Sequence, residues 1–452
     1  MNIQMKFISS VTAASFILLT GCKKEEDVIV SSNRSASYNA SQQIVPALLY
    51  TSDVPLAWYK LANTLVRTAP GHAPPVAART FGYMGLALYE SVVAGIPAHQ
   101  SIQDQLNGLP VLPKADKTKK YYYPACANAA LANMIHHMFG NTTAAQNFTI
   151  DSLENVFTKL FQSEVSIDHF DRSVKFGRDI SNAIYEWSKT DGGDKAYLNL
   201  YPANYIPPVG EGKWIPLPGQ SAQLPYWGNN RTFIAGNASN TQPGIPVTYS
   251  TNPASQYYKE EWEVYNESIN QDPEHRIIAL YWAAIPPPCV SISILSSVIT
   301  DKRTNLAKAA EAYCKLGIAI SDAFVSCWKT KYQFNQERPI TFIRNNFNAN
   351  WNSLIPTPPF PDCTSGHSVQ TGAAARVLAD IFGDNTSFTD YSINELGFVP
   401  RKFNAFSDYA NEVGLSRIYG GIHIRSSDFV GLSQGNLVGT HVSALHFKKP
   451  DT

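Results

Sequence analysis

The sequence predicts a mainly α-helical protein, and three observations carry the prediction. Apolar residues recur at the spacing of a helix face in eight segments. No alternating apolar and polar series of any length indicates a β-strand. The stretch 201–253 is dense in Pro, Gly and Trp, which is typical of a long ordered loop joining two helical halves. The eight segments are 77–93, 125–139, 171–187, 260–268, 275–284, 291–329, 367–382 and 403–419.

Each predicted helix is supported by apolar residues that recur at helical spacing within that segment. Segment 77–93 follows the start signal Pro74-Pro75 and places Phe81, Met84, Leu88 and Val92 on one face. Segment 125–139 is rich in alanine, the strongest helix former, and keeps Leu131, Met134 and Met138 in phase. Segment 171–187 repeats the pattern up to Trp187, and the later segments continue it to Tyr419.

Composition narrows the classes of function. The 452 residues include 36 basic and 36 acidic side chains, so the formal net charge is zero. That balance argues against a chain-wide basic surface, and no nucleic-acid partner is expected. Hydrophobic residues make up 44% of the chain, which is enough for a packed core and excludes wholesale disorder.

The first residues indicate export. Residues 1–21 combine Lys6 with a short apolar stretch and end in Leu-Thr-Gly before Cys22, which resembles a bacterial lipobox. By that resemblance 1–21 is a lipoprotein signal peptide and Cys22 is lipidated. Residues 22–45 predict a flexible tether, and 46–452 the folded domain. We expect a chain anchored by lipid to the outer membrane, with the acidic cluster after Cys22 weakly suggesting exposure at the cell surface.

Five further cysteines follow Cys22, at 126, 289, 314, 327 and 363. An odd number forbids complete pairing within the chain, and no spacing suggests a metal knuckle. We interpret most of them as small buried hydrophobes.

The first segment with chemistry runs from Lys331 to Arg338 and Pro339. Seven residues are nearly two helical turns, so a continuous helix would place both cations on one face, roughly 10 Å apart. The helix is expected to end near Arg338, because Pro339 disfavours helix at the residue before it. Two cations at a helix end could clamp an oxyanion. For this segment taken alone, a solvated basic face is the favoured explanation.

The second segment is a Pro-rich loop that delivers Ser365, Gly366 and His367 to the start of an Ala-rich helix. A helix N-terminus has unpaired N–H groups and the positive end of the dipole, so it suits an anion. Ser365 adds a hydroxyl donor, Gly366 a closely approachable N–H, and His367 a group that moves protons. The alternative is a plain serine cap beside a surface histidine.

The third segment contains Arg417, two glycines at 420 and 421, and His423. Arg417 lies in phase with the apolar residues Phe406, Ala410 and Val413, so its guanidinium is expected on a buried face and needs an anionic partner. The glycine pair breaks the helix and could turn His423 toward the same point. A structural histidine is the alternative. Together, the three segments predict a site for a highly charged tetrahedral oxyanion.

The three segments resemble the motif pattern of the type 2 phosphatidic acid phosphatase superfamily. Within it the chain looks like a vanadium-dependent haloperoxidase, on the residues around Lys331, the loop with Phe360 and the run Arg-Ile-Tyr-Gly-Gly-Ile-His. The N-terminal stretch 75–91 also resembles bacterial haloperoxidases. The resemblance implies two packed helical bundles with long Pro-rich loops, and an active site within 325–430.

The resemblance also implies roles for the site residues. Lys331, Arg338 and Arg417 would neutralise the oxygens of vanadate, assisted by Ser365 and the Gly366 N–H. His423 would supply the single bond from protein to metal, and His367 would deprotonate hydrogen peroxide. Lys331 would polarise the bound oxidant, so that halide, with iodide or bromide favoured, is oxidised to hypohalous acid. Phe360 and Trp328 are candidates for a halide pocket, although Trp328 also fits a core residue.

Two alternatives stay open. Phosphate is isosteric with vanadate and could occupy the same site, which would make the chain a soluble acid phosphatase acting through a phosphohistidine at His423. A non-catalytic anion-binding lipoprotein is the third interpretation, because three positions depart from the pattern: Thr364 replaces a proline, Asp428 is displaced by one residue, and Ala283 follows Trp282 where relatives often carry an acid.

Overall fold

The computed structural model describes residues 45–450. The predicted signal peptide, the predicted lipidation site Cys22 and nearly all of the predicted tether lie outside the described residues. Within 45–450, no helix combines the length and the apolar character needed to cross a membrane.

The described chain is built from α-helices with one small hairpin, which confirms the mainly α prediction. The antiparallel hairpin pairs β1 (Phe388–Asp390) with β2 (Arg401–Phe403). Short 3-10 turns occupy Ala47–Leu49, Val93–Gly95, Gln103–Gln105, Ala196–Leu198, Trp227–Asn229 and Asn394–Leu396. The helices are α1 (Asp53–Thr68), α2 (Pro74–Val92), α3 (Tyr123–Met138), α4 (Ala144–Gln162), α5 (Ile167–Ser188), α6 (Asn237–Asn240), α7 (Gln256–Ile269), α8 (Pro273–Tyr281), α9 (Pro287–Asp301), α10 (Leu306–Phe334), α11 (Pro339–Asn346), α12 (Gly366–Phe382), α13 (Phe406–Tyr419) and α14 (Arg425–Ser443).

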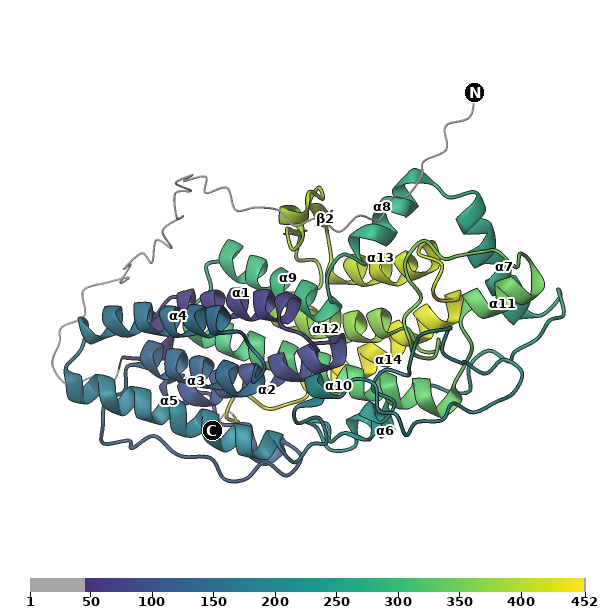
Figure 1. Ribbon diagram of the computed structural model, residues 1–452. Coiled ribbons are helices and arrows are strands. Elements are labelled where there is room, and N and C mark those ends of the chain that lie inside the picture. The colour runs from purple at the N-terminus through teal and green to yellow at the C-terminus, as the bar shows by residue number, and fades with distance from the viewer. Residues whose placement is uncertain (1–44, 451–452) are drawn as a thin grey trace, which may run out of the picture. The chain divides into compact units, whose positions relative to one another are not determined.

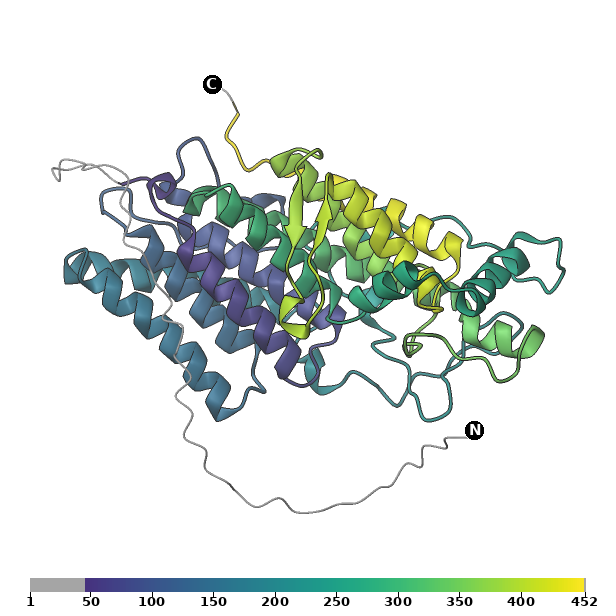
Figure 2. The same ribbon diagram turned by 90° about the horizontal axis from the view of Figure 1, so that it is seen from above.

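The helices form two bundles that share α10. Helices α1 to α5 pack on one another, with α9 against α1, and α12 packs with α13 and α14, with α8 against α13. Helix α10 lies against both α2 and α12 (Figures 1 and 2). Helices α10 and α2 approach closely at Gly317, where a Cβ would lie only 2.4 Å from the Phe81 carbonyl oxygen. Helix α10 therefore carries residues from the first bundle into the second.

The single helical segment expected over 291–329 is wrong, because the structure has two helices there. Helix α9 ends at Asp301, and Arg303 adopts a left-handed conformation with φ of 47°. The side chain of Asn305 then caps α10 by accepting from the Lys308 N–H. This turn lets α10 reverse direction and reach the second bundle.

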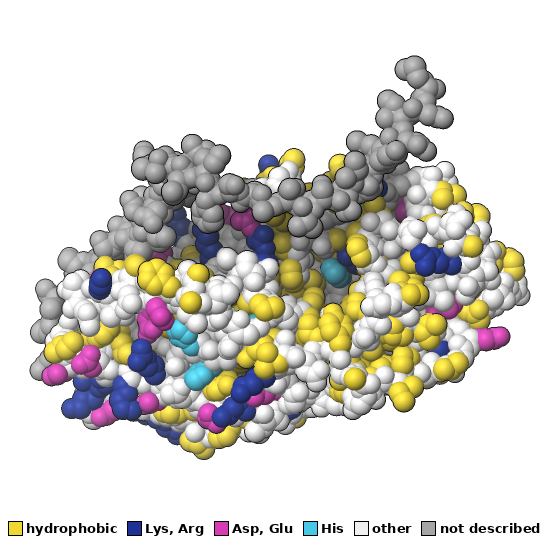
Figure 3. Space-filling view, viewed as in Figure 1, with side chains coloured by type: hydrophobic (Ala, Val, Ile, Leu, Met, Phe, Trp, Pro, Cys, Tyr) yellow, Lys and Arg dark blue, Asp and Glu magenta, His cyan; other side chains and the backbone are white. Residues whose placement is uncertain are grey.

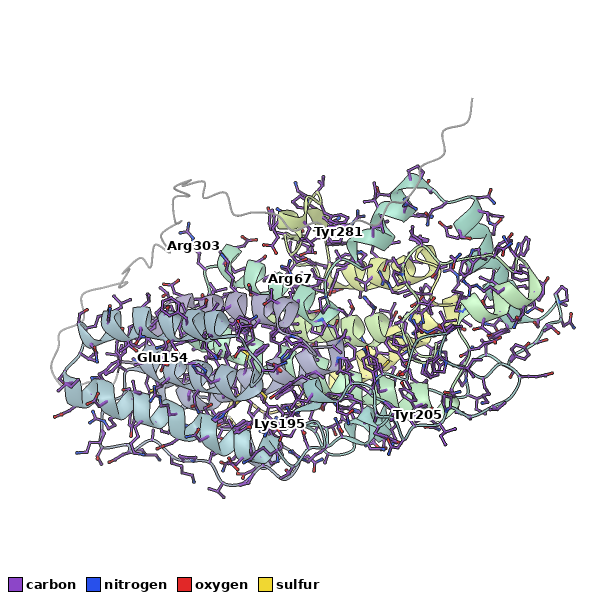
Figure 4. All side chains as sticks on the ribbon, viewed as in Figure 1. Arg67, Glu154, Lys195, Tyr205, Tyr281 and Arg303 are labelled. Carbon is purple, nitrogen blue, oxygen red and sulfur yellow. The ribbon has the colours of Figure 1, made fainter. Side chains whose placement is uncertain are left out.

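The stretch 201–253 is largely irregular, as its composition predicts, with one 3-10 turn and the short helix α6. It is held against the segments that carry the chemistry: the Trp214 N–H donates to the Asn335 carbonyl, and the Gln223 N–H to the Pro359 carbonyl. Tyr205, labelled in Figure 4, meets Tyr332 of α10 edge to face at 5.2 Å. Hydrophobic side chains are spread over the right half of the face in Figure 3, and the loop exposes Ile206, Val209 and Ile245.

Candidate active site

Lys331 lies in the last turn of α10 and is completely buried, so the interpretation as a solvated basic face is wrong for this residue. Its Nζ donates to the carbonyl oxygens of Pro361 and Asp362, at 2.8 and 2.7 Å. Lysine is rarely fully buried unless polar partners receive its charge. The Pro-rich loop thus folds over the end of α10 and fixes the ammonium group.

Arg338 reaches the same place by a different path from the one expected. Helix α10 ends at Phe334, and Asn335 turns the chain with a left-handed φ of 51°. Lys331 and Arg338 therefore do not share one helix face, and that expectation is wrong. Arg338 is extended before Pro339, as the proline requires. Its Nε donates to the Phe360 carbonyl at 2.8 Å and its Nη1 to the Ile422 carbonyl at 2.7 Å.

The N-terminus of α12 supplies the second motif. Ser365 is the N-cap, and its Oγ accepts from the Ser368 N–H at 3.4 Å. Gly366 is the first helical residue, and a Cβ there would come within 3.4 Å of the Trp328 ring. A serine hydroxyl has both a proton and lone pairs. Ser365 can therefore accept the capping hydrogen bond and still act as the predicted donor to an anion.

An aromatic wall borders the two cations. The rings of Trp328 and Phe360 are 4.9 Å apart. Lys331 Nζ lies 5.1 Å from the centre of the Phe360 ring, and Arg338 Cζ lies 5.0 Å from it. Trp328 is buried and its Nε1 donates to the Gln223 carbonyl. Trp328 is therefore a core residue that also lies beside Lys331, and its place in a halide pocket stays a prediction.

Arg417 is buried in the last turn of α13, as its apolar phase predicts. Its Nε donates to Ser416 Oγ at 2.9 Å and its Nη2 to the Ala279 carbonyl at 3.3 Å. Its Nη1 lies 3.5 Å from His367 Nε2, which in turn lies 3.2 Å from the Trp282 carbonyl oxygen. Backbone carbonyls at the end of α8 thus contact Arg417 and His367 where the sequence has no acid after Trp282.

His423 follows the turn at Gly420 and Gly421, where Gly421 has a φ of 77°. The imidazole is buried. Its Nε2 lies 3.1 Å from Arg338 Nη1, and its Nδ1 lies 2.7 Å from Asp362 Oδ1 and 3.2 Å from Ser427 Oγ. The turn therefore brings the third motif to the first, as the glycine pair suggests.

Asp362 is the residue that sequence reasoning missed. It lies in the Pro-rich loop, is fully buried, and contacts both His423 and Arg338, the latter at 3.6 Å. Asp428, the acid closest to the motif position, instead accepts from Ser368 Oγ at 3.0 Å. The only available signal for Asp362 was a carboxylate within a loop otherwise made of proline, phenylalanine, cysteine and threonine.

The buried cations are electrostatically costly. Burial lowers the pKa of Lys331 to about 8, and it lowers the pKa values of Arg338 and Arg417 to about 10. Burial and then the neighbouring cations lower the pKa values of His367 and His423 well below their usual value. Burial also raises the pKa of Asp362 to about 6. Burial is the largest cause of each of these shifts, and the neighbouring cations add to the lowering of the pKa values of both histidines.

The residues fit a tetrahedral oxyanion such as vanadate. Arg338 Nη2 is buried and has no hydrogen-bond partner among residues 45–450. No group of three or more His, Cys, Asp or Glu side chains in that range could hold a metal ion. What the site offers is three cations, a hydroxyl, a helix N-terminus and two histidines, which together match an anion held mainly through its oxygens.

Comparisons with known proteins identify relatives of the fold. A family model described as the second helical-bundle domain of VCPO matches residues 311–450. A solved structure described as the first bacterial vanadium-dependent iodoperoxidase is 31% identical, with a TM-score of 0.79. The match covers 88% of this chain and 98% of that one.

Two structures of a bacterial vanadium-dependent chloroperoxidase, described as holo-type and apo-type, share the fold. The first is 15% identical with a TM-score of 0.66, covering 85% of this chain and 95% of that one. The second is 14% identical with a TM-score of 0.64, covering 85% and 98%. No curated protein sequence matches the chain. The similarity to the iodoperoxidase extends over nearly the whole of both chains, and the chain therefore belongs to the vanadium-dependent haloperoxidase family.

Proposed function

We propose that the protein binds vanadate and uses hydrogen peroxide to oxidise halide, with iodide or bromide favoured, to hypohalous acid. The observation that carries the proposal is the convergence of Lys331, Arg338 and Arg417 in one buried site with an unpaired guanidinium nitrogen. The description of the 31% identical relative as an iodoperoxidase supports the halide preference.

The chain's residues have distinct roles in this proposal. When bound, vanadate would supply a Lewis-acid centre that activates peroxide, and the oxidation state of the vanadium would not change. Lys331, Arg338 and Arg417 neutralise its oxygens, and Ser365 and the Gly366 N–H donate to them. His423 presents Nε2 as the protein ligand. These groups are held by backbone carbonyls and helix ends, so little reorganisation is needed on binding.

His367 is the proposed general base. Burial, Arg417 and His423 lower its pKa well below the usual value, so the imidazole is neutral near neutral pH and can accept a proton from hydrogen peroxide. Of His367 and the six residues proposed to contact vanadate, only His367 is partly exposed, which suits a group that exchanges protons with solvent. Trp328 and Phe360 form the proposed wall of the halide pocket.

Phosphatase activity is the second candidate, and one observation favours it. The Asp362 carboxylate lies 2.7 Å from Nδ1 of His423, and a nearby group that orients the reacting side chain is typical of nucleophilic catalysis. Phosphate could occupy the same cradle of cations, with His367 protonating the leaving group.

One experiment separates the candidates. The mature protein is incubated with orthovanadate, and peroxide-dependent oxidation of iodide, bromide and chloride is measured beside hydrolysis of p-nitrophenyl phosphate. Halide oxidation that requires vanadate supports the proposal. Phosphatase turnover inhibited by vanadate supports the alternative, and vanadate binding with neither activity identifies a non-catalytic protein. His423→Ala should abolish either activity, whereas His446→Ala, at an exposed histidine outside the site, should not.

We also propose that the enzyme acts outside the cytoplasm on a lipid anchor at Cys22, as the lipobox resemblance implies. Radiolabelled palmitate should then be incorporated by cells expressing the full chain and not by cells expressing Cys22→Ala. Equal labelling of both would contradict the anchor.

A further inference from the structure

We propose that Glu412 is a positioning residue that acts through Trp282. It fixes the C-terminal end of α8, which in turn holds Arg417 and His367 in the proposed vanadate site. The importance of this role for catalysis rests on the proposed function, whereas the role itself is tested on anion binding alone.

Among residues 45–450, Arg417 is buried without a hydrogen-bonded carboxylate. Its guanidinium contacts Ser416 Oγ, His367 Nε2 and the Ala279 carbonyl oxygen, the last at 3.3 Å. A buried cation needs a counter-charge or good acceptors, and the C-terminal end of a helix carries partial negative charge. The end of α8 therefore supplies what a nearby carboxylate would otherwise supply.

At this end of α8, two carbonyl groups are left for partners outside the helix. The Ala283 N–H, which would continue the helix to Ala279, donates to the Leu280 carbonyl instead. The Trp282 carbonyl would need an N–H four residues later, where Pro286 has none. The first of these carbonyls accepts from the buried guanidinium, and the second lies 3.2 Å from the imidazole Nε2 of the proposed general base.

Glu412 attaches the same end of α8 to α13. Its Oε1 accepts from the indole N–H of the buried Trp282 at 2.9 Å. Arg401 of β2 holds the carboxylate through two contacts, from Nε to Oε1 at 2.6 Å and from Nη2 to Oε2 at 2.8 Å. Because a two-pronged contact with arginine fixes the direction of a carboxylate as well as its position, the indole has a fixed acceptor.

One helix carries both the anchor of α8 and the cation that the end of α8 contacts. Glu412 and Arg417 lie five residues apart on α13. Trp282 contributes to both attachments, since its indole N–H donates to Glu412 and its own carbonyl lies beside His367. Loss of the indole contact therefore loosens the residue whose carbonyl borders the proposed vanadate site.

Aromatic packing is the competing explanation for the position of Trp282. Its ring lies 4.8 Å from the ring of Tyr281, 5.4 Å from that of Tyr409 and 6.1 Å from that of Phe403. A phenylalanine would keep most of this packing and lose only the N–H. The hydrogen bond to Glu412 has a charged acceptor, and such bonds are roughly twice as strong as neutral ones.

The test measures orthovanadate binding to the full-length protein by equilibrium dialysis, without peroxide or halide. Glu412→Ala removes the acceptor, and Trp282→Phe removes the indole N–H. Each should weaken binding by about 10-fold, the lower end of the range for outer partners of a metal site. Because both changes break the same contact, the double variant should bind like either single variant, within about twofold. Glu412→Gln keeps an acceptor oxygen and should recover part of the affinity.

Two matched variants serve as controls. Trp58→Phe removes a buried indole N–H that donates to Asn128 in the first bundle. Glu274→Ala removes the other carboxylate that contacts Arg401, at the start of α8. Both should bind vanadate like the wild type. Near-ultraviolet circular dichroism establishes that each variant is folded.

Two outcomes would overturn the assignment. Unchanged affinity in a folded Glu412→Ala would show that the carboxylate does not position the site. Losses that add in the double variant would show that Glu412 does not act through Trp282. A protein that gives the expected pattern of binding but oxidises no halide would contradict the proposed function and leave the role of Glu412 in place.

Discussion

Arg338 Nη1 lies 3.1 Å from Nε2 of His423 and 3.5 Å from its Nδ1, while Nη2 of the same guanidinium is buried without a partner among residues 45–450. A buried unsatisfied donor costs about 1–3 kcal/mol, and more when it is charged. The chain tolerates this cost at the point where Lys331 and Arg417 also converge. An oxygen of a bound oxyanion is the acceptor that would satisfy Nη2.

Arg338→Ala should therefore weaken vanadate binding strongly. Removing one partner of a buried charged contact costs about 2–5 kcal/mol, so at least about a 30-fold loss is expected. Equilibrium dialysis against orthovanadate measures it. Arg376→Ala is the control, since Arg376 lies on α12 and pairs with Asp380 away from the site. A change of less than about twofold in Arg338→Ala would show that the guanidinium does not hold the anion.

The pH dependence of anion binding should report Lys331. Burial lowers its pKa to about 8, and a bound anion favours the charged ammonium. The free protein therefore loses this proton as pH rises through about 8, and affinity should fall by up to about tenfold per pH unit above it. Sulfate is the suitable probe, because its own charge stays constant over this range.

Lys331→Arg provides the matched comparison, since arginine stays charged at every pH used. Isothermal titration with sulfate should show the decline in the wild type and a flatter profile in the variant. Identical profiles would assign the titration to another group.

The sequence was sufficient for the helical class and for the helices with a clear apolar face, such as α2 and α12. It failed for α14, which has glycines at 431, 435 and 439. Glycine lowers helix propensity, so a helix whose glycines allow close packing is not predicted as a helix from its sequence. Helix α4 was also missed, although Thr143 and Gln146 form a capping box at its start.

The sequence identified motif residues that the fold brings close together, but it did not predict their geometry. Lys331, Arg338, Ser365, Arg417 and His423 were identified through motifs, yet periodicity placed Lys331 and Arg338 on one helix. A left-handed Asn335 ends that helix, and local pattern does not reveal such a residue. Asp362 was missed because its partner His423 is 61 residues later in the chain, and only tertiary packing joins them.

A buried glutamate behind the site should make stability depend on pH. Glu261 of α7 is fully buried, and burial, followed by the charges of Asp362 and Glu337, raises its pKa well above 4.5. Its stabilising contribution is complete below about pH 4.5 and is lost as pH rises, because only the unfolded chain then releases the proton. The free energy of unfolding should fall by up to about 1.4 kcal/mol per pH unit in that window.

Glu261→Gln removes this titration while keeping the shape of the side chain. Urea unfolding at a series of pH values should show the variant gaining stability relative to the wild type as pH rises above about 4.5. Glu186→Gln, at a largely exposed glutamate of α5, is the control and should give no such trend. Parallel curves for Glu261→Gln and the wild type would contradict a protonated Glu261.

Gly435→Ala should destabilise the protein even though alanine favours helices over glycine by about 1 kcal/mol. A Cβ at Gly435 would lie 2.0 Å from the Val369 carbonyl oxygen and 2.9 Å from the Ala373 nitrogen, and both are backbone atoms of α12 that cannot rotate away. Overpacking of this kind typically costs about 1–3 kcal/mol, and a backbone contact lies at the upper end. Urea unfolding should show a net loss of stability, while Gly244→Ala, with no atom within 4 Å of its Cβ, should show almost none.

The same substitution should also weaken vanadate binding. Helix α12 begins at Gly366 and the first turn of α14 carries Ser427, so separating the two helices should disturb the proposed vanadate site. A variant with unchanged affinity would show that the site does not depend on this contact.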